Sequence, residues 1–164
     1  MTFVVAGART TIEDPESVLA RARRWGSDHG ADILLADARA VFGRDHLISA
    51  ALHAERARSL ARMTARSVAL EALLYLSGRR QVADAIHSAG LRGKTKGVAI
   101  VIFDGTDGDA FLRSMGWTRD DTTLDARGKS LRLLGIGSRE ETTIPPGSRP
   151  DLALEKVALV DVLK

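Results

Sequence analysis

Two short stretches near the middle of the chain contain residue types that are used in phosphate chemistry. Residues 93–95 (Gly-Lys-Thr) match the end of a P-loop, and residues 103–106 (Phe-Asp-Gly-Thr) match the start of an aspartyl phosphatase motif. A P-loop also needs a glycine five residues before Gly93, a strand before the loop and a helix after it. Ser88 occupies that position, and the pattern predicts a helix before the loop and a strand after it. The sequence therefore disfavours a nucleotide-binding P-loop.

The phosphatase-like stretch lacks its second carboxylate. That chemistry uses two carboxylates two residues apart, one as the nucleophile and one to transfer the proton. Asp104 follows a predicted buried strand, but Thr106 stands at the partner position and the next acid is Asp107. A strand-ending turn rich in Asp and Gly is the simpler explanation of these residues. A phosphoryl-transfer enzyme centred on Asp104 remains the alternative interpretation.

The histidines do not form a recognisable catalytic or metal site. His46 and His53 are separated by about 10 Å along a predicted helix, too far to share a metal ion easily. His53 and Glu55 match part of a zinc deaminase pattern, but that pattern needs cysteines and the chain has none. No nucleophile–base pair is visible. We therefore expect a binding protein without catalytic residues, metal or cofactor.

Positive charge is concentrated in the middle of the chain. The net charge is +3, but residues 56–96 carry seven Arg and two Lys against only two acidic residues, a net charge of +7. Acidic residues outnumber basic ones in residues 1–55 and again in residues 104–164. A basic segment indicates either a solvated helix face or a surface that binds a polyanion, and both interpretations stay open at this point.

The hydrophobic pattern predicts one α+β domain over residues 1–164, with a small mixed or antiparallel sheet packed against several helices. Residues 67–77 fit either a strand or a helix by period, but Ala, Leu and Glu favour a helix capped by Ser67 and ended by Gly78. Residues 131–136 stay open between a helix end and a strand. No apolar run is long enough for a signal peptide or a membrane span, so we expect a cytoplasmic protein. Strands are expected at 2–6, 33–37 and 97–103, and helices at 15–30, 44–63, 67–77, 81–89, 110–115 and 152–163.

An ordered run of elements from Ile33 to Phe103 resembles a known family. It contains residues 71–78 (Glu-Ala-Leu-Leu-Tyr-Leu-Ser-Gly), then Arg-Gln-Val at 80–82, and then the strand at 97–103. The run is similar to the small non-catalytic subunit of the KEOPS complex, the family of the PRPK-binding protein TPRKB and its archaeal counterparts. The order of elements extends this resemblance to the C-terminal helix.

The resemblance implies a non-catalytic, regulatory subunit that docks on the small kinase-like ATPase of the KEOPS complex. We expect the isolated chain to be a monomer. It implies that the subunit supports this ATPase and helps to recruit tRNA, in archaeal members through the 3′ CCA end. Another subunit then installs the threonylcarbamoyl group on the adenosine beside the anticodon. The implied partners are the rest of that complex and tRNA, with no membrane and no cofactor.

Candidate tRNA-binding residues flank the two ends of the helix predicted at 81–89, where one phosphate track can reach them. A single-stranded end also needs a stacking side chain, and Tyr75 is the only tyrosine. The alternative is that Tyr75 belongs to the core. The basic candidates are Arg79, Arg80, Arg92, Lys94 and Lys96, with Arg56, Arg58 and Arg62 as a second group.

Two segments are candidates for the surface that docks on a protein partner. The segment 152–163, if helical, has apolar residues on more than one side, so one face can pack on the core and another can bind the partner. The alternative is that all of these residues are core or that the segment is a strand. The candidate docking residues are Leu154, Val157, Leu159 and Val160, together with Phe111 and Met115 of the helix at 110–115.

Overall fold

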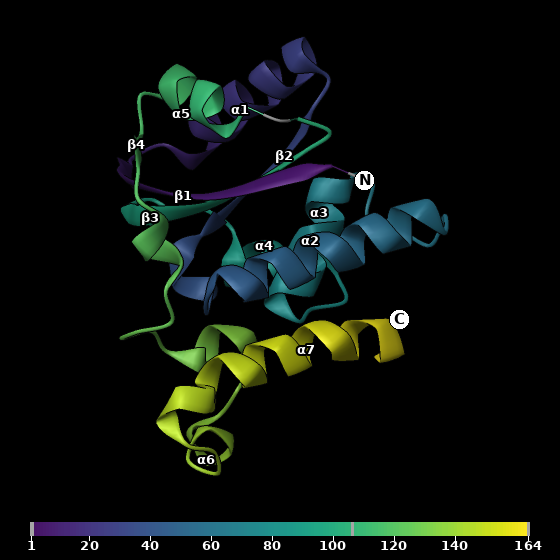
Figure 1. Ribbon diagram of the computed structural model, residues 1–164, viewed down its shortest axis with the longest axis vertical. Coiled ribbons are helices and arrows are strands. Elements are labelled where there is room, and N and C mark those ends of the chain that lie inside the picture. The colour runs from purple at the N-terminus through teal and green to yellow at the C-terminus, as the bar shows by residue number, and fades with distance from the viewer. Residues whose placement is uncertain (1, 106, 164) are drawn as a thin grey trace.

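A four-stranded antiparallel sheet lies between two layers of helices (Figure 1). The structure is a computed structural model that describes residues 2–105 and 107–163. The strands are β1 (Phe3–Ile12), β2 (Asp32–Asp37), β3 (Thr95–Phe103) and β4 (Thr118–Arg119), in the order β2-β3-β1-β4. The predicted α+β class with an antiparallel sheet is confirmed.

Most helices of the described residues lie in the layers on either side of this sheet, and the C-terminal helices α6 and α7 lie outside the layer that contains α2 and α3 (Figure 1). They are α1 (Pro15–His29), α2 (Arg44–Ser59), α3 (Val68–Ser77), α4 (Val82–Ala89), α5 (Gly108–Met115), α6 (Ser138–Glu141) and α7 (Arg149–Leu163). Short 3₁₀ helices connect them: η1 (Ala38–Ala40), η2 (Asp121–Leu124), η3 (Leu131–Leu134) and η4 (Pro146–Ser148). None of these described helices has both the length and the apolar character needed to cross a membrane.

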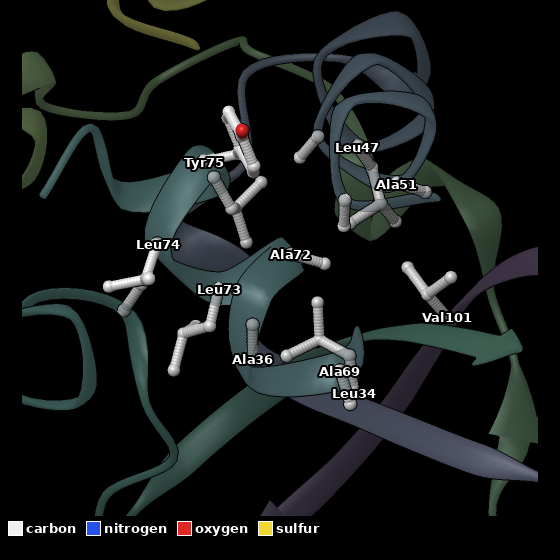
Figure 2. Close-up of a cluster of buried hydrophobic side chains, with 14 of the residues drawn as sticks. Leu34, Ala36, Leu47, Ala51, Ala69, Ala72, Leu73, Leu74, Tyr75 and Val101 are labelled. Atoms are coloured by element: carbon white, nitrogen blue, oxygen red, sulfur yellow. The ribbon is translucent and has the colours of Figure 1, made fainter. Parts of the chain in front are cut away.

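The central strand β3 is apolar on both faces because helices cover both faces of the sheet. Alternate residues of a strand point to opposite faces. Val98 and Ile100 pack in the cluster that contains α1 and α5, whereas Ala99 and Val101 pack in the cluster that contains α2, α3 and α7. Figure 2 shows Ala72 of α3 facing Ala51 of α2 and Val101 of β3 in this second cluster. The prediction that residues 97–103 form a strand buried on both faces is confirmed.

Local capping explains why α3 is a helix although its hydrophobic period is ambiguous. The Ser67 hydroxyl accepts a hydrogen bond from the Leu70 N–H at the first turn. Gly78 ends the helix in the left-handed conformation, with φ of 68°, which a glycine adopts without steric cost. Both predicted signals are confirmed. They outweigh the alternating pattern that would suit a strand.

Several elements differ from the sequence-based expectation. Strand β1 continues to Ile12 because it pairs with β3 as far as Thr95. Residues 131–134 form the 3₁₀ helix η3, which settles the open choice between a helix end and a strand. Helix α4 turns Ala85 and Ala89 to the core, so the large side chain of Ile86 is exposed.

Candidate functional site

A basic cleft with a volume of about 540 Å³ lies at one end of the sheet, where β1 and β2 end and β3 begins. Lys94 and Lys96, two of the predicted tRNA-binding residues, line this cleft. Its other cationic side chains come from segments that the sequence did not single out. We call the six residues together the basic cleft: Arg9, Arg39, Lys94, Lys96, Arg127 and Lys129.

Two arginines of the cleft are held in place by carboxylates. The Nε and Nη2 groups of Arg39 donate to Asp37 at 2.7–3.2 Å, and the Thr95 hydroxyl donates to the same carboxylate at 3.1 Å. Burial acts to raise the pKa of Asp37, but the hydrogen bonds from the Arg39 side chain and backbone outweigh it, so the pKa is lowered. Arg9 pairs with Asp120 at 2.8 Å in the same way. Both guanidinium groups are therefore fixed in position at the cleft.

Lys129, in the segment between η2 and η3, also lines the cleft. Its Nζ donates to the carbonyl oxygens of Val41 and Thr123 at 2.7 and 2.6 Å. Burial lowers the pKa of this amine to about 8, although Asp125 and Asp37 act to raise it. Lys129 is therefore still mostly a cation at pH 7 and loses its charge just above the physiological range.

The other predicted tRNA-binding arginines do not line this cleft. Arg79 lies against Gly135, and Arg80 donates to the carbonyl oxygen of Leu163 at 3.2 Å. Arg92 donates to the carbonyl oxygen of His87. Of the five basic candidates around α4, the fold thus brings only the two lysines into the cleft.

Arg58, in the second group of candidates, is engaged with two carboxylates. Its guanidinium donates to Glu55 at 2.7–3.1 Å and to both oxygens of Asp104 at 2.6 and 2.9 Å. The hydrogen bond from Arg58 lowers the pKa of Asp104. Asp104 therefore ties the end of β3 to α2, and its oxygens already accept from a cation. Thr106, at the position of the second phosphatase carboxylate, lies outside the described residues.

Tyr75 belongs to the core. Its side chain is 1% exposed, and its hydroxyl donates to Asp161 of α7. A base cannot stack on a ring that is buried in this way, so the structure corrects the assignment of Tyr75 as a stacking platform. The apolar residues on either side of Tyr75 in α3 were the sequence signal for the alternative interpretation, in which Tyr75 belongs to the core.

Several of the predicted docking residues are also core residues. Val157 and Val160 of α7 pack with α2 and α3, while Phe111 and Met115 of α5 pack with α1 under the other face of the sheet. These four side chains cannot contact a partner directly in this structure. Leu154 is half-buried and Leu159 is 36% exposed, so Leu159 is the one of the six that lies open to a partner.

Exposed apolar side chains lie on the second halves of α2 and α7, two helices that pack against each other. His53 of α2 contacts Asp161 of α7 at 2.7 Å, so the two helices meet at this pair. Leu52 precedes His53, and Val162, which is 76% exposed, follows Asp161. We call this surface the apolar strip, and it consists of Leu52, Leu60, Leu159, Val162 and Leu163. The sequence did not single out Leu52, Leu60, Val162 or Leu163.

His46 does not line the basic cleft and has a structural role. His46 is buried; its Nδ1 accepts from the Phe42 N–H at 3.1 Å and its Nε2 donates to the Leu76 carbonyl at 3.1 Å. Burial lowers its pKa to about 4. Within residues 2–105 and 107–163, no three His, Asp or Glu side chains are grouped in a way that could hold a metal ion.

Comparison with protein families gives one match that covers well over half of the chain. The family described as kinase binding protein CGI-121 matches residues 12–126. This range runs from the end of β1 to the loop after η2 and includes most of the sheet and helices α1 to α5. No curated protein matches the chain.

Proposed function

The chain belongs to the CGI-121 family of kinase binding proteins, and we propose that it is a non-catalytic subunit that docks on a kinase-like ATPase through the apolar strip. We propose further that the assembly is the KEOPS complex and that this subunit helps to recruit tRNA for threonylcarbamoyl-adenosine modification. The family match supports the first proposal, and the resemblance of residues 33–103 supports the second.

The observation that carries the docking proposal is the position of the apolar strip. Soluble proteins seldom leave neighbouring apolar side chains open unless a partner covers them. Val162, at 76% exposure, and Leu159 lie one helical turn apart on the outer side of α7. Exposed charged residues accompany them: Glu155 lies one turn before Leu159 on α7, and Arg56 lies between Leu52 and Leu60 on α2. An apolar centre with a polar rim is typical of protein interfaces.

Helix α7 can present this strip because its opposite side is anchored. Val157 and Val160 are buried against α2 and α3. Asp161 adds polar contacts, because it accepts from the Tyr75 hydroxyl and pairs with His53. The helix therefore holds its outer apolar residues in a fixed orientation before a partner arrives, which lowers the entropic cost of association.

The basic cleft supports the proposal that tRNA is recruited by this chain. The cleft lies at the start of β3, whereas Arg58 of α2, two residues from the apolar strip, contacts Asp104 just after the end of β3. Strand β3 has nine residues and so spans about 27 Å. An RNA in the cleft and a protein on the strip would thus lie at opposite ends of the sheet and could bind at the same time.

The alternative, a phosphoryl-transfer enzyme centred on Asp104, has less support. Both carboxylate oxygens of Asp104 accept hydrogen bonds from Arg58, and the basic cleft lies at the opposite end of β3 from Asp104. A nucleophilic carboxylate must be open to a phosphorus atom. Measurable phosphatase or ATPase turnover by the isolated chain that disappears in Asp104→Asn would reinstate this alternative.

The docking proposal is tested with charged variants of equal exposure on two sides of the molecule. Leu159 and Leu19 are both 36% exposed, but Leu19 lies on α1, beyond the other face of the sheet. We expect Leu159→Asp and Val162→Asp to weaken binding to the kinase-like ATPase by at least about 10-fold, because each places a charge in an apolar interface. Leu19→Asp should bind normally.

Calorimetric titration of the purified ATPase gives the affinities, and circular dichroism shows that each variant is folded. If Leu159→Asp and Val162→Asp bind as tightly as the wild-type protein, the docking surface lies elsewhere. If Leu19→Asp weakens binding equally, the effect is not specific to the strip.

A further inference from the structure

The basic cleft has donors that no group of the described chain uses. Arg39 and Arg9 contact their carboxylates through Nε and Nη2, and their side chains are 63% and 66% exposed. The Nη1 groups of both arginines make no hydrogen bond within the described residues. A guanidinium that is fixed on one edge and open on the other is well suited to a phosphate, because little rotational freedom is left to lose on binding.

The cleft also has an excess of positive charge. Lys94, Lys96 and Arg127 form no ion pair with any residue in 2–105 and 107–163. Asp125 is the one acid among the described lining residues, and Asp37 and Asp120 are occupied by arginines. With Lys129 protonated, six cations face three carboxylates, which leaves a local net charge of +3.

The loop that carries the two lysines is held in an unusual conformation. Lys94 has a φ of 71°, in the left-handed region that non-glycine residues seldom adopt. Its N–H donates to the Ile12 carbonyl at 2.6 Å, and the Arg92 N–H donates to the Thr95 hydroxyl at 3.1 Å. These bonds fix the loop, so the two lysines emerge from a defined backbone rather than from a freely moving one.

The described lining of the cleft has no aromatic ring on which a base could stack. Among the described lining residues, those without charge are Ala38, Gly97, Thr122 and Thr123, and none is aromatic. Proteins that read single-stranded bases stack them on aromatic rings or on Arg guanidinium planes, and the guanidinium groups of Arg9 and Arg39 are each paired with a carboxylate. Tyr75 is buried and does not line the cleft. The chemistry of the cleft therefore suits phosphate oxygens better than bases.

Resting on the proposed recruitment of RNA, we propose that the basic cleft is a phosphate subsite that binds two or more neighbouring phosphate groups and contacts no base. The volume of about 540 Å³ is in the usual range for a small-ligand site. The phosphates can come from an RNA backbone or from a soluble polyphosphate such as inorganic triphosphate. In either case the ligand is recognised by its charge and phosphate spacing.

Three probes separate these sources: an unstructured RNA octamer, an abasic ribose-phosphate oligomer of the same length, and inorganic triphosphate. We expect the RNA and the abasic oligomer to bind within twofold of each other, and triphosphate to compete with both. Fluorescence anisotropy with the full-length protein gives the affinities. An RNA that binds 10-fold or more tightly than the abasic oligomer would show that bases are read, and the proposal would be wrong.

A matched pair of double variants locates the site. Lys94→Glu with Lys96→Glu changes the cleft, whereas Arg23→Glu with Arg24→Glu makes the same change of charge on exposed positions of α1. The first pair should weaken all three probes by at least about 10-fold. It should also reduce the slope of log affinity against log salt for the oligomers by at least about 1.4, since each lost cation contributes about 0.7 with single strands. The second pair should change affinity by less than threefold.

Equal effects of the two pairs would mean that only net charge matters and that no subsite exists. Thermal denaturation checks that both pairs are folded, as expected for exposed side chains. If triphosphate binds with this dependence on Lys94 and Lys96 but tRNA does not bind, the subsite stands and the proposed recruitment of tRNA fails. If none of the probes binds, the subsite itself is refuted.

Discussion

Protonation of His46 should lower the free energy of unfolding in mild acid. The ring is buried, its Nδ1 accepts from the Phe42 N–H, and its Nε2 donates to the Leu76 carbonyl. A second proton would remove the acceptor and place a charge in the core. Burial is the main cause of the lowered pKa, about 4 compared with 6.5 for an ordinary histidine.

The sign and size of the effect follow from this difference in pKa. The unfolded chain takes up the proton near pH 6.5, whereas the folded protein resists protonation until about pH 4. The contribution of His46 is therefore complete above pH 6.5 and is lost as the pH falls toward 4. The loss is about 1.4 kcal/mol per pH unit, or about 3 kcal/mol in total.

Urea denaturation at pH 7, 6 and 5 measures this effect, with His46→Gln as the variant that cannot titrate. As the pH is lowered from 7 to 5, the free energy of unfolding of the wild-type protein should decrease more steeply than that of the variant. An NMR titration of the His46 ring serves as the second readout, and a pKa below 5 is expected. Parallel pH profiles of the two proteins, or a ring pKa near 6.5, would refute the reasoning.

Three further predictions concern single side chains. Val160→Asp should unfold the protein because the side chain is buried, whereas Val162→Asp should leave the melting temperature nearly unchanged, and thermal denaturation distinguishes them. Arg58→Ala should lower the free energy of unfolding by about 3 kcal/mol, since it leaves the buried carboxylate of Glu55 without its guanidinium, and urea denaturation tests this. Binding of triphosphate at pH 8 should be accompanied by proton uptake, because a bound anion raises the pKa of Lys129 from about 8. Calorimetry in two buffers of different ionisation enthalpy should detect this uptake. The uptake should disappear in Lys129→Met.

The local part of the fold could be predicted because its signals are local. The cap at Ser67 and the left-handed terminator at Gly78 define α3, and the apolar run at 97–103 defines the central strand. The extension of β1 to Ile12 could not be predicted. It depends on pairing with β3, and Ile12 and its partner Thr95 are far apart along the chain.

The basic cleft was only partly predictable, because the net charge of each sequence segment does not show which cationic side chains the fold brings together. Lys94 and Lys96 belong to the segment that is rich in positive charge. Arg9, Arg39 and Arg127 come from flanking segments with more acids than bases, and the sheet and η2 bring them to the same place. Only a contact map, or pairing information between distant segments, could have identified them.

The apolar strip could not be predicted from the sequence for a different reason. Period analysis showed that α7 has apolar residues on more than one side, and this is confirmed. It could not say which side packs on the core. Val157 and Val160 are buried because they meet α2 and α3, and Val162, about half a turn after Val160, is left exposed on the opposite side of the helix. Tyr75 shows the same limit, since its burial depends on α7 covering it.

The central claim is that the apolar strip is the surface that docks on the kinase-like ATPase. Hydrogen–deuterium exchange of the full-length chain, alone and with a saturating amount of the purified ATPase, tests this claim most directly. We predict slower exchange in peptides that cover the C-terminal ends of α2 and α7, residues 52–60 and 159–163, and unchanged exchange in α1 and α5. Slower exchange confined to α1 and α5, or no change anywhere at saturation, would contradict the claim.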